Sequence, residues 1–315
     1  MDMPETASFI DWFDQMAISL ESDCVRIVVI PTMGAKIVSL YDKVNAYEWL
    51  AEPMRPLKPA GYGADFVSQD MSGWDEMMPT ISTCRFRNIT LPDHGEVWGI
   101  PWNIDKATAE LCFSVNGVAL PYHFSRCIAF ENEHTLIFQY CLTNTGEQIM
   151  PFLWAAHPQF NADESTRILL PDEIDYLLNV IADHPNWGRS ESQVTWPAAR
   201  DLHDVPHQLD RIGPADLHAC RKFYTDPGSP AAWAALQHHF SGSRLRMEWS
   251  TADLPYLGLW VDEGVYNAKP VVALEPASGY FDSLENAIAR KQVNWLMPGA
   301  QMDWQLRLVI GNETD

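Results

Sequence analysis

The chain has 315 residues, 47% of them hydrophobic, and its formal net charge is −21. The length and apolar content are enough for a large core and argue against a disordered chain. The acidity, without any Lys/Arg cluster, argues against nucleic acid or an anionic membrane as partner, and it disfavours a highly phosphorylated substrate.

The N-terminal residues and the cysteines indicate a cellular compartment. Residues 1–9 are acidic and polar, without the basic and apolar regions of a signal peptide. No stretch approaches the roughly 20 apolar residues that a membrane helix needs. The cysteines show no C-x-x-C spacing: they are Cys24, Cys84, Cys112, Cys127, Cys141 and Cys220. We therefore expect a cytoplasmic protein with free thiols and no membrane partner.

The first part of the chain predicts β-hairpins. Residues 8–16 form a short, weakly amphipathic lead-in, interpreted as one helical turn. Alternating β-branched residues then predict strands at 24–30, 36–41 and 47–50. A segment rich in proline and glycine, 51–63, predicts a loop.

Residues 73–79 have the sequence Gly-Trp-Asp-Glu-Met-Met-Pro, in which two adjacent carboxylates, Asp75 and Glu76, follow Trp74. This composition is typical of a functional loop, and also of a solvated turn. The sequence leaves both interpretations open.

A second polar segment, 92–98, contains His94 and Trp98, and its proline and glycine predict a turn. His94 does not lie on an apolar face, so the usual explanation of a core histidine is weak here. A functional role and a structural one are equally compatible with the pattern.

The central part of the chain consists of strand-like runs without interleaved helices. Strands are predicted at 109–115, 121–130 and 135–143, followed by a strand that ends at His157. Turn residues separate these runs. Such a meander predicts an all-β protein, a large antiparallel β-sandwich, in preference to a parallel α/β sheet.

His157 is the one ionisable group in the apolar segment 151–160, and Pro158 follows it. Proline cannot donate to a sheet ladder, so the strand should end there and leave the imidazole at its tip. Imidazole exchanges protons near neutral pH, which suits acid–base catalysis. A core or rim histidine is the alternative interpretation of this segment alone.

The later part of the chain adds strands at 165–170, 233–240, 244–250 and 256–261. The least regular region is 172–217, which is rich in proline, aspartate and histidine. It lacks the ligand spacings of a metal site, so we interpret it as a polar loop and expect no metal.

Residues 271–276 repeat the pattern found at His157: an apolar strand, an ionisable last residue, Glu275, and then proline. A carboxylate and an imidazole at the open ends of two strands can act as general base and acid. The sequence has no G-x-S-x-G, G-x-G-x-x-G or P-loop pattern. It therefore predicts cofactor-free proton chemistry on a small polar substrate.

The C-terminal part predicts a helical turn at 283–289 and a hairpin formed by 293–296 and 302–310. No internal repeat of roughly 20–50 residues and no linker composition divides the chain. We therefore expect residues 1–315 to form a single domain.

These segments together resemble the galactose mutarotase-like (aldose 1-epimerase) superfamily, from roughly Val25 to Leu308. The segments that resemble it are Pro31–Leu40, Gly73–Pro79, His94–Gly95, Trp154–Phe160, Leu274–Pro276 and Trp295–Gly299. No single one is diagnostic, but their order and spacing together are fairly specific. The resemblance implies a large sandwich with a concave sugar-binding face and no cofactor.

The resemblance also implies a mechanism. Glu275 would take the proton from the anomeric hydroxyl while His157 protonates the ring oxygen, so that the ring opens, rotates about C1–C2 and closes. His94 would hold the ring oxygen or a neighbouring hydroxyl. The substrate-binding residues that it implies are Trp74, Asp75, Glu76, Trp98 and Phe160.

The chain departs from the hexose-6-phosphate branch of this superfamily at Trp98, where that branch has an arginine that helps bind phosphate. Arg85 or Arg87 are the available substitutes. The superfamily's acidic substrate ligand is also not aligned; Asp201, Asp204 and Asp262 are alternatives for it.

Three functions follow. The leading one is a mutarotase that acts on a free sugar. The others are a hexose-6-phosphate 1-epimerase and a carbohydrate-binding protein without catalysis.

Overall fold

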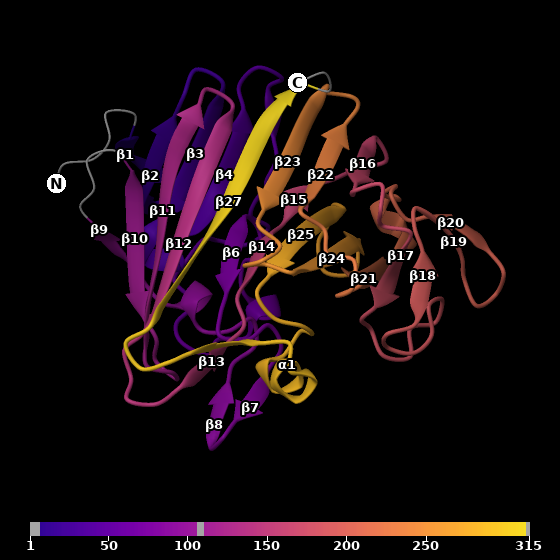
Figure 1. The fold of residues 1–315 in the computed structure, drawn as a ribbon. Helices are drawn as coiled ribbons and strands as arrows, with labels where there is room; N and C mark the ends of the chain where they lie inside the picture. Colours follow the sequence, from indigo (N-terminus) through magenta and orange to yellow (C-terminus); the bar gives the residue numbers. More distant parts are fainter. Residues whose placement is uncertain (1–6, 106–109, 313–315) are drawn as a thin grey trace.

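The computed structural model describes residues 7–105 and 110–312. Two large antiparallel sheets form a sandwich, which confirms the predicted all-β class (Figure 1). Strands with one face toward the core alternate buried and less buried residues, as β11 (Tyr122–Asn132) and β23 (Ser243–Trp249) do. The strand β25 (Val271–Ala277) is buried at every residue because both of its faces are covered.

The larger sheet has 13 strands and holds the segments that matter for the site. Its main path runs in the order β1 (Ala7–Trp12), β2 (Gln15–Glu21), β3 (Val25–Ile30), β4 (Lys36–Asp42), β6 (Trp74–Met77), β14 (Ala155–Pro158), β25, β24 (Tyr256–Glu263), β21 (Ala219–Thr225), β17 (Tyr176–Asn179) and β18 (Gln193–Thr195). Two short strands lie beside this path: β5 (Tyr47–Glu48) pairs with β4, and β15 (Phe160–Asn161) pairs with β25.

The second sheet has eight strands, in the order β16 (Thr166–Leu169), β22 (Trp233–His238), β23, β27 (Gln301–Asn312), β12 (Thr135–Asn144), β11, β10 (Leu111–Asn116) and β9 (Asn103–Asp105). Three small sheets complete the strands: β7 (Cys84–Phe86) with β8 (Ile89–Leu91), β13 (Met150–Phe152) with β26 (Asn294–Leu296), and β19 (Ala198–Arg200) with β20 (Pro206–Gln208). The α-helix α1 (Leu284–Arg290) follows β25, and short 3-10 turns lie at Pro31–Met33, Phe66–Ser68, Val97–Gly99 and Ala215–Leu217. In the described part of the chain, no helix has the length and apolar character needed to span a membrane.

Four sequence-based expectations are corrected. The segments 293–296 and 302–310 do not form a hairpin, because β26 pairs with β13 while β27 pairs with β12 and β23. Residues 8–16 belong to the hairpin of β1 and β2, whose turn residues Phe13 and Asp14 both have positive φ, instead of a helical turn. Residues 74–77 form the buried strand β6 and are not a loop. The region 172–217 contains β17–β20, which project at the right of Figure 1. The single-domain assignment stays a prediction.

The expectation that all cysteines are free is wrong for one pair. Cys112 on β10 lies directly opposite Cys127 on β11, and the two sulfurs form a disulfide. Cross-strand pairing depends on the register between two strands, which residue spacing alone does not give.

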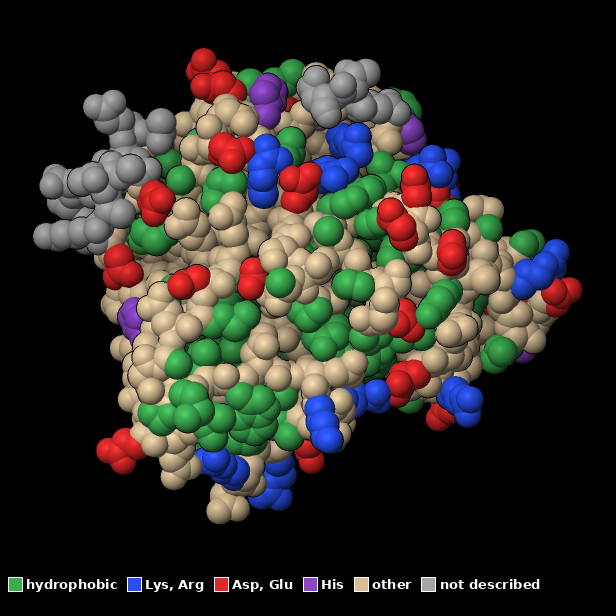
Figure 2. All heavy atoms as spheres, in the orientation of Figure 1, with side chains coloured by type: hydrophobic (Ala, Val, Ile, Leu, Met, Phe, Trp, Pro, Cys, Tyr) green, Lys and Arg blue, Asp and Glu red, His purple; other side chains and the backbone are tan. Residues whose placement is uncertain are grey.

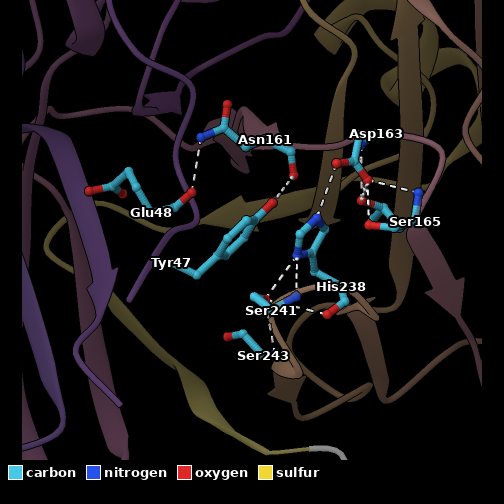
Figure 3. Close-up of polar contacts among 9 residues, drawn as sticks. Tyr47, Glu48, Asn161, Asp163, Ser165, His238, Ser241 and Ser243 are labelled. Carbon is cyan, nitrogen blue, oxygen red and sulfur yellow. Dashed lines mark hydrogen bonds and ion pairs between the residues drawn. The ribbon is translucent and has the colours of Figure 1, made fainter. Parts of the chain in front are cut away.

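Beside the strand β5, a polar cluster joins the two sheets (Figure 3). The ring of His238 on β22 stacks on Tyr47, and its Nε2 lies 3.1 Å from a carboxylate oxygen of Asp163. Its Nδ1 lies 2.8 Å from Oγ of Ser241 and also accepts the backbone N–H of that residue. Ser241, His238 and Asp163 are connected by hydrogen bonds in the same order as the residues of a hydrolytic triad. However, Ser241 and His238 belong to one tight turn, and the backbone N–H of Ser241 also donates to the same imidazole nitrogen. The cluster therefore braces this turn against β5.

Basic and acidic side chains are mixed on the face shown in Figure 2, where basic groups lie mainly near the edges and uncharged side chains cover most of the centre. This face has no extended basic area of the kind that binds nucleic acid. The expectation of no nucleic-acid partner stays a prediction.

Candidate active site

The candidate site lies on three adjacent strands of the larger sheet. The register places Gly258 of β24 between Tyr224 of β21 and Glu275 of β25. A Cβ atom on Gly258 would lie 2.8 Å from Oε2 of Glu275 and 3.4 Å from the Tyr224 ring. Because Gly258 has no side chain, the Glu275 carboxylate has room to lie over β24 and to extend toward β21.

The carboxylate borders a pocket of about 240 Å³. The polar residues that line it are Ser82, His94, His157, Gln159, Lys222, Glu275 and Asp282. Its aromatic lining consists of Phe66, Trp260 and Tyr266. Charged groups beside aromatic rings are a common composition of sugar-binding sites, because the rings stack on C–H surfaces while the polar groups bind hydroxyls.

The structure brings His157 and Glu275 together. Nδ1 of His157, at the end of β14, lies 3.0 Å from Oε1 of Glu275, and both side chains are almost fully buried. A carboxylate accepts hydrogen bonds, so Nδ1 is the donor and Nε2 is left for a ligand. The two strand-end residues singled out in the sequence form a hydrogen-bonded acid–base pair.

Lys222 of β21 is the other partner of Glu275. Its Nζ lies 2.9 Å from Oε2 of Glu275 and 3.1 Å from Oδ1 of Asp282. The hydroxyl of Tyr224 donates to the same oxygen of Asp282 at 2.9 Å. Sequence reasoning did not identify Lys222, although its place in an alternating strand puts it on the same face as Tyr224.

The electrostatics of Glu275 follow from these neighbours. Burial alone would raise the pKa of this carboxyl, but the Lys222 ammonium and the hydrogen bond from His157 outweigh it and lower the pKa to about 2. Burial works against the Lys222 ammonium as well, yet Asp282 and Glu275 raise its pKa above the ordinary value. Glu275 is therefore a carboxylate and Lys222 a cation at neutral pH.

His94 faces the same pocket from a turn in which both it and Gly95 have positive φ. Its ring stacks on Phe66 at 3.9 Å and lies 5.2 Å from the ring of His157, while Nδ1 is 2.8 Å from a carboxylate oxygen of Asp93. Burial lowers the pKa of His94 in spite of Asp93, so the ring is neutral at pH 7. A neutral ring can hold a sugar hydroxyl without adding charge.

The β6 residues predicted to bind substrate lie away from the pocket lining. The ring of Trp74 stacks on Phe138, and Asp75 is within 2.7 Å of Nζ of Lys36. Glu76 is wholly buried. Three donors contact its carboxylate: Arg126 at 2.7 Å, Tyr140 at 3.0 Å and Trp154 at 2.9 Å. These positions correct the expectation of direct sugar contact.

The other two predicted contacts are also displaced. Trp98 is buried and packs edge-on against Phe66, one layer behind the pocket wall. Phe160 is fully buried and packs edge-on against Trp49 and Trp74. The aromatic wall is supplied instead by Trp260 and its neighbours, which sequence reasoning missed because Trp260 lies in an ordinary strand pattern.

None of the three aspartates weighed as the acidic ligand lines this pocket. Asp262 is buried and accepts backbone N–H groups of the turn 265–267. Asp201 holds the turn before β20 and contacts His207, and Asp204 lies in the same turn. Asp282, from the loop between β25 and α1, is the acidic residue that lines the pocket together with Glu275.

A larger cavity of about 460 Å³ lies beside the β19–β20 hairpin, lined by Trp187, His207 and Arg211 among others. Cys220 lies in the walls of both cavities. His207 at the larger cavity is held by Asp201 of the turn before β20, so of these two cavities we place the candidate site in the smaller one, where His157, Lys222 and Glu275 meet.

In the described residues, one group of metal-ligand side chains comes together: Glu110, Cys112 and Cys127. Both of its sulfurs are joined in the disulfide and have no thiolate to offer a metal ion. This cluster therefore does not fit a metal.

Comparison with models of protein families gave no match, and neither did comparison with curated proteins. Solved structures do match. A galactose mutarotase-like protein from Lactobacillus casei ATCC 334 has 18% sequence identity and a TM-score of 0.68, covering 94% of this chain and 100% of that one. A galactose mutarotase-like protein from Clostridium acetobutylicum has 15% identity and a TM-score of 0.67, covering 97% and 98%.

A protein from Klebsiella pneumoniae, provisionally described as an aldose 1-epimerase, has 14% identity and a TM-score of 0.71, covering 94% of this chain and 79% of that one. At such identities the likeness shows the fold alone. The chain has the galactose mutarotase-like fold, which confirms the fold that the sequence resemblance implied.

Proposed function

We propose that the protein is an aldose 1-epimerase, which interconverts the α and β anomers of a free aldose. The observation that supports this most is the hydrogen-bonded pair of His157 and Glu275 in a small pocket with an aromatic wall. The pair offers a base and an acid within reach of one ligand.

In the proposed reaction, Glu275 takes the proton of the anomeric hydroxyl and the O–H electrons form the C1=O1 bond. The C1–O5 bond breaks, and O5 receives a proton from Nε2 of His157, which enters the reaction as the imidazolium and leaves it as the neutral ring with its proton on Nδ1. Rotation about C1–C2 then presents the other face of the aldehyde, and the ring closes with the two roles reversed. Each positioned proton transfer contributes on the order of 10²–10⁴ in rate. The neutral ring of His94 would hold a sugar oxygen.

The charges of the pocket favour a free sugar over a sugar phosphate. Lys222 is the one lysine or arginine among the residues that line the pocket, and it lies between Glu275 and Asp282. The three groups sum to one negative charge. Arg85 and Arg87, the possible phosphate ligands, are exposed and lie outside the lining.

The experiment is polarimetry or NMR on freshly dissolved α-glucose and α-galactose, with and without the protein. A faster approach to the anomeric equilibrium, lost in Glu275→Gln, would support the epimerase. Sugar binding without acceleration would favour the carbohydrate-binding alternative, and activity confined to glucose 6-phosphate would favour the phosphosugar enzyme. The proposed place of action is the cytoplasm, on the sequence grounds given above.

A further inference from the structure

Lys222 has a hydrogen-bond donor to spare. An ammonium group has three N–H bonds. Among the described residues, Nζ of Lys222 has two ion-pair partners, an oxygen of Glu275 and an oxygen of Asp282. The side chain is 12% exposed and lines the pocket. The third N–H is therefore available to a ligand.

Glu275 has an acceptor to spare at the same place. Its Oε1 takes the hydrogen bond from His157, but Oε2 accepts none from the described residues, because Lys222 approaches it as an ion pair without hydrogen-bond alignment. The carboxylate is fully buried. A carboxylate oxygen has two lone pairs, so beside its ion pair with Lys222 Oε2 can accept a hydrogen bond from a donor that enters the pocket.

The two spare positions belong to neighbouring atoms, Nζ and Oε2, 2.9 Å apart. A ligand atom that meets both must donate to the carboxylate and accept from the ammonium. A hydroxyl does both, whereas an ionised carboxylate or phosphate oxygen has no proton to donate.

We propose that Lys222 is a catalytic residue of this site: its ammonium binds the anomeric oxygen and stabilises the negative charge that develops there as Glu275 removes the proton. This inference rests on the proposed epimerase function. It assigns to a residue outside the His157–Glu275 pair the stabilisation of the charged transition state.

The protons balance without Lys222 losing one. The anomeric proton moves to Glu275, the ring oxygen takes a proton from His157, and the Lys222 N–H stays on nitrogen throughout. A donor aimed at the atom where charge develops acts mainly on the transition state, and removing one such donor typically lowers kcat by about 10²–10³.

A purely structural role for Lys222 is the main alternative. In that case the ammonium only neutralises two carboxylates, and its loss would lower stability without a specific effect on O1. The two roles predict different responses to a ligand that lacks the anomeric hydroxyl.

The first test measures mutarotation by Lys222→Met and Lys222→Gln at equal folded concentration, established by circular dichroism and thermal melting. We expect kcat to fall by about 10²–10³ with a smaller change in KM. Lys222→Arg, which retains the charge, should recover part of the loss. The control is Lys43→Met, which breaks a 2.7 Å ion pair with Glu21 outside the pocket lining and should keep full activity. Variants of Lys222 with wild-type kcat would overturn the inference and leave the proposed epimerase intact.

The second test compares the wild type with Lys222→Met by calorimetric binding of two sugars: glucose, and 1,5-anhydroglucitol, which lacks the anomeric hydroxyl. If polarimetry shows that galactose is the better substrate, galactose and its 1,5-anhydro analogue are used instead. Loss of a hydrogen bond from a charged donor should weaken binding of the aldose by about tenfold and leave the anhydro sugar almost unchanged. An equal loss for both ligands, or none, would contradict the contact with O1. Because this test reads binding alone, it remains decisive if the wild type binds sugar without epimerising it. A wild type that binds neither ligand would overturn both proposals.

The pH profile gives a third measurement. His157, Lys222, Tyr224 and Asp282 are the titratable groups that face or adjoin Glu275. Without the Lys222 ammonium, burial dominates and the pKa of Glu275 rises, so the acid limb of kcat/KM moves to higher pH in Lys222→Gln. An unmoved acid limb would mean that Lys222 does not act on the base.

Discussion

Two glutamates of the larger sheet, Glu76 on β6 and Glu275 on β25, are both wholly buried and each faces a cation, yet their surroundings differ. Both oxygens of Glu76 have hydrogen-bond donors, supplied by Arg126, Tyr140 and Trp154. One oxygen of Glu275, Oε2, has only the ion-pair contact with Lys222. A buried ion pair with every acceptor used is sealed into the core, whereas one with an acceptor and a donor left over beside a cavity is able to bind a ligand.

The pKa directions match this difference. Burial raises the pKa of Glu76 and the Arg126 guanidinium only partly offsets it. At Glu275 the nearby Lys222 and His157 outweigh burial, so the charged form is favoured. Glu76 is thus a structural residue of the core, whereas Glu275 is kept in its charged form beside the pocket.

The largest expected effect comes from exchanging each glutamate for glutamine. Glu275→Gln removes the base and should lower kcat by roughly 10²–10⁴ while the fold is kept, because glutamine has nearly the same shape. Glu76→Gln should leave the kcat of folded molecules unchanged and lower stability instead. Polarimetry and urea unfolding on both variants measure this crossed outcome. Full activity in Glu275→Gln would remove the basis of the comparison.

A second prediction concerns Arg126, whose guanidinium is fully buried against Glu76. Arg126→Met leaves the Glu76 carboxylate without its counter-charge and should cost about 3–5 kcal/mol of unfolding free energy. Arg307→Met is the matched control: its ion pairs with Glu131 and Glu248 are partly exposed to solvent, so it should cost at most about 1 kcal/mol. Equal urea midpoints for the two variants would show that burial of the pair has no structural weight.

A smaller effect is expected at Gly258. A methyl group there would lie 2.8 Å from Oε2 of Glu275 and would displace the carboxylate. Misplacement of a reacting group by about 1 Å costs on the order of 10²-fold in rate, so Gly258→Ala should lower kcat by up to that factor. Gly228→Ala serves as the control for glycine replacement, because Gly228 is exposed, lies outside the pocket lining and has no positive φ. Unchanged kcat in Gly258→Ala would mean that the carboxylate position is not set by this close approach.

The last prediction concerns the free energy of unfolding in acid, where the contribution of Glu275 changes with pH. The pKa of Glu275 falls from the ordinary value of 4.5 to about 2 on folding. Since the folded-state pKa is the lower one, its stabilising contribution is present above pH 4.5 and is lost as the pH falls from 4.5 to 2. The stability difference between wild type and Glu275→Gln should therefore shrink through this range in urea titrations. A difference independent of pH would contradict the lowered pKa.

Much of the sandwich could be predicted from the sequence, because a strand that alternates apolar and polar residues between two turns can be recognised from a short stretch of sequence alone. The strand β6 could not. Its Asp75 and Glu76 are residue types that are normally exposed, and their burial depends on Lys36 of β4 and Arg126 of β11. The cations that make this burial possible are distant in the sequence.

The site shows the same limit. His157 and Glu275 stand out in the sequence because each is the ionisable residue of an apolar run and is followed by proline. The expected strand end is wrong for Glu275, since β25 continues through Pro276 to Ala277. Lys222 looks like an ordinary residue of an alternating strand. It contacts Glu275 because β21 and β25 are the two neighbours of β24 in the sheet, an arrangement that the sequence of β21 alone does not indicate.

The distance along the chain between His157 and Glu275 also bears on how the molecule folds. Their hydrogen bond joins residues 118 positions apart, through the neighbouring strands β14 and β25. Non-local strand pairs form slowly, since the entropy of closing a long loop must be overcome before the contact stabilises anything. During refolding, local hairpins should therefore form before the pocket does. Recovery of mutarotase activity would then follow the pairing of the distant strands β14 and β25 more closely than recovery of β-structure would.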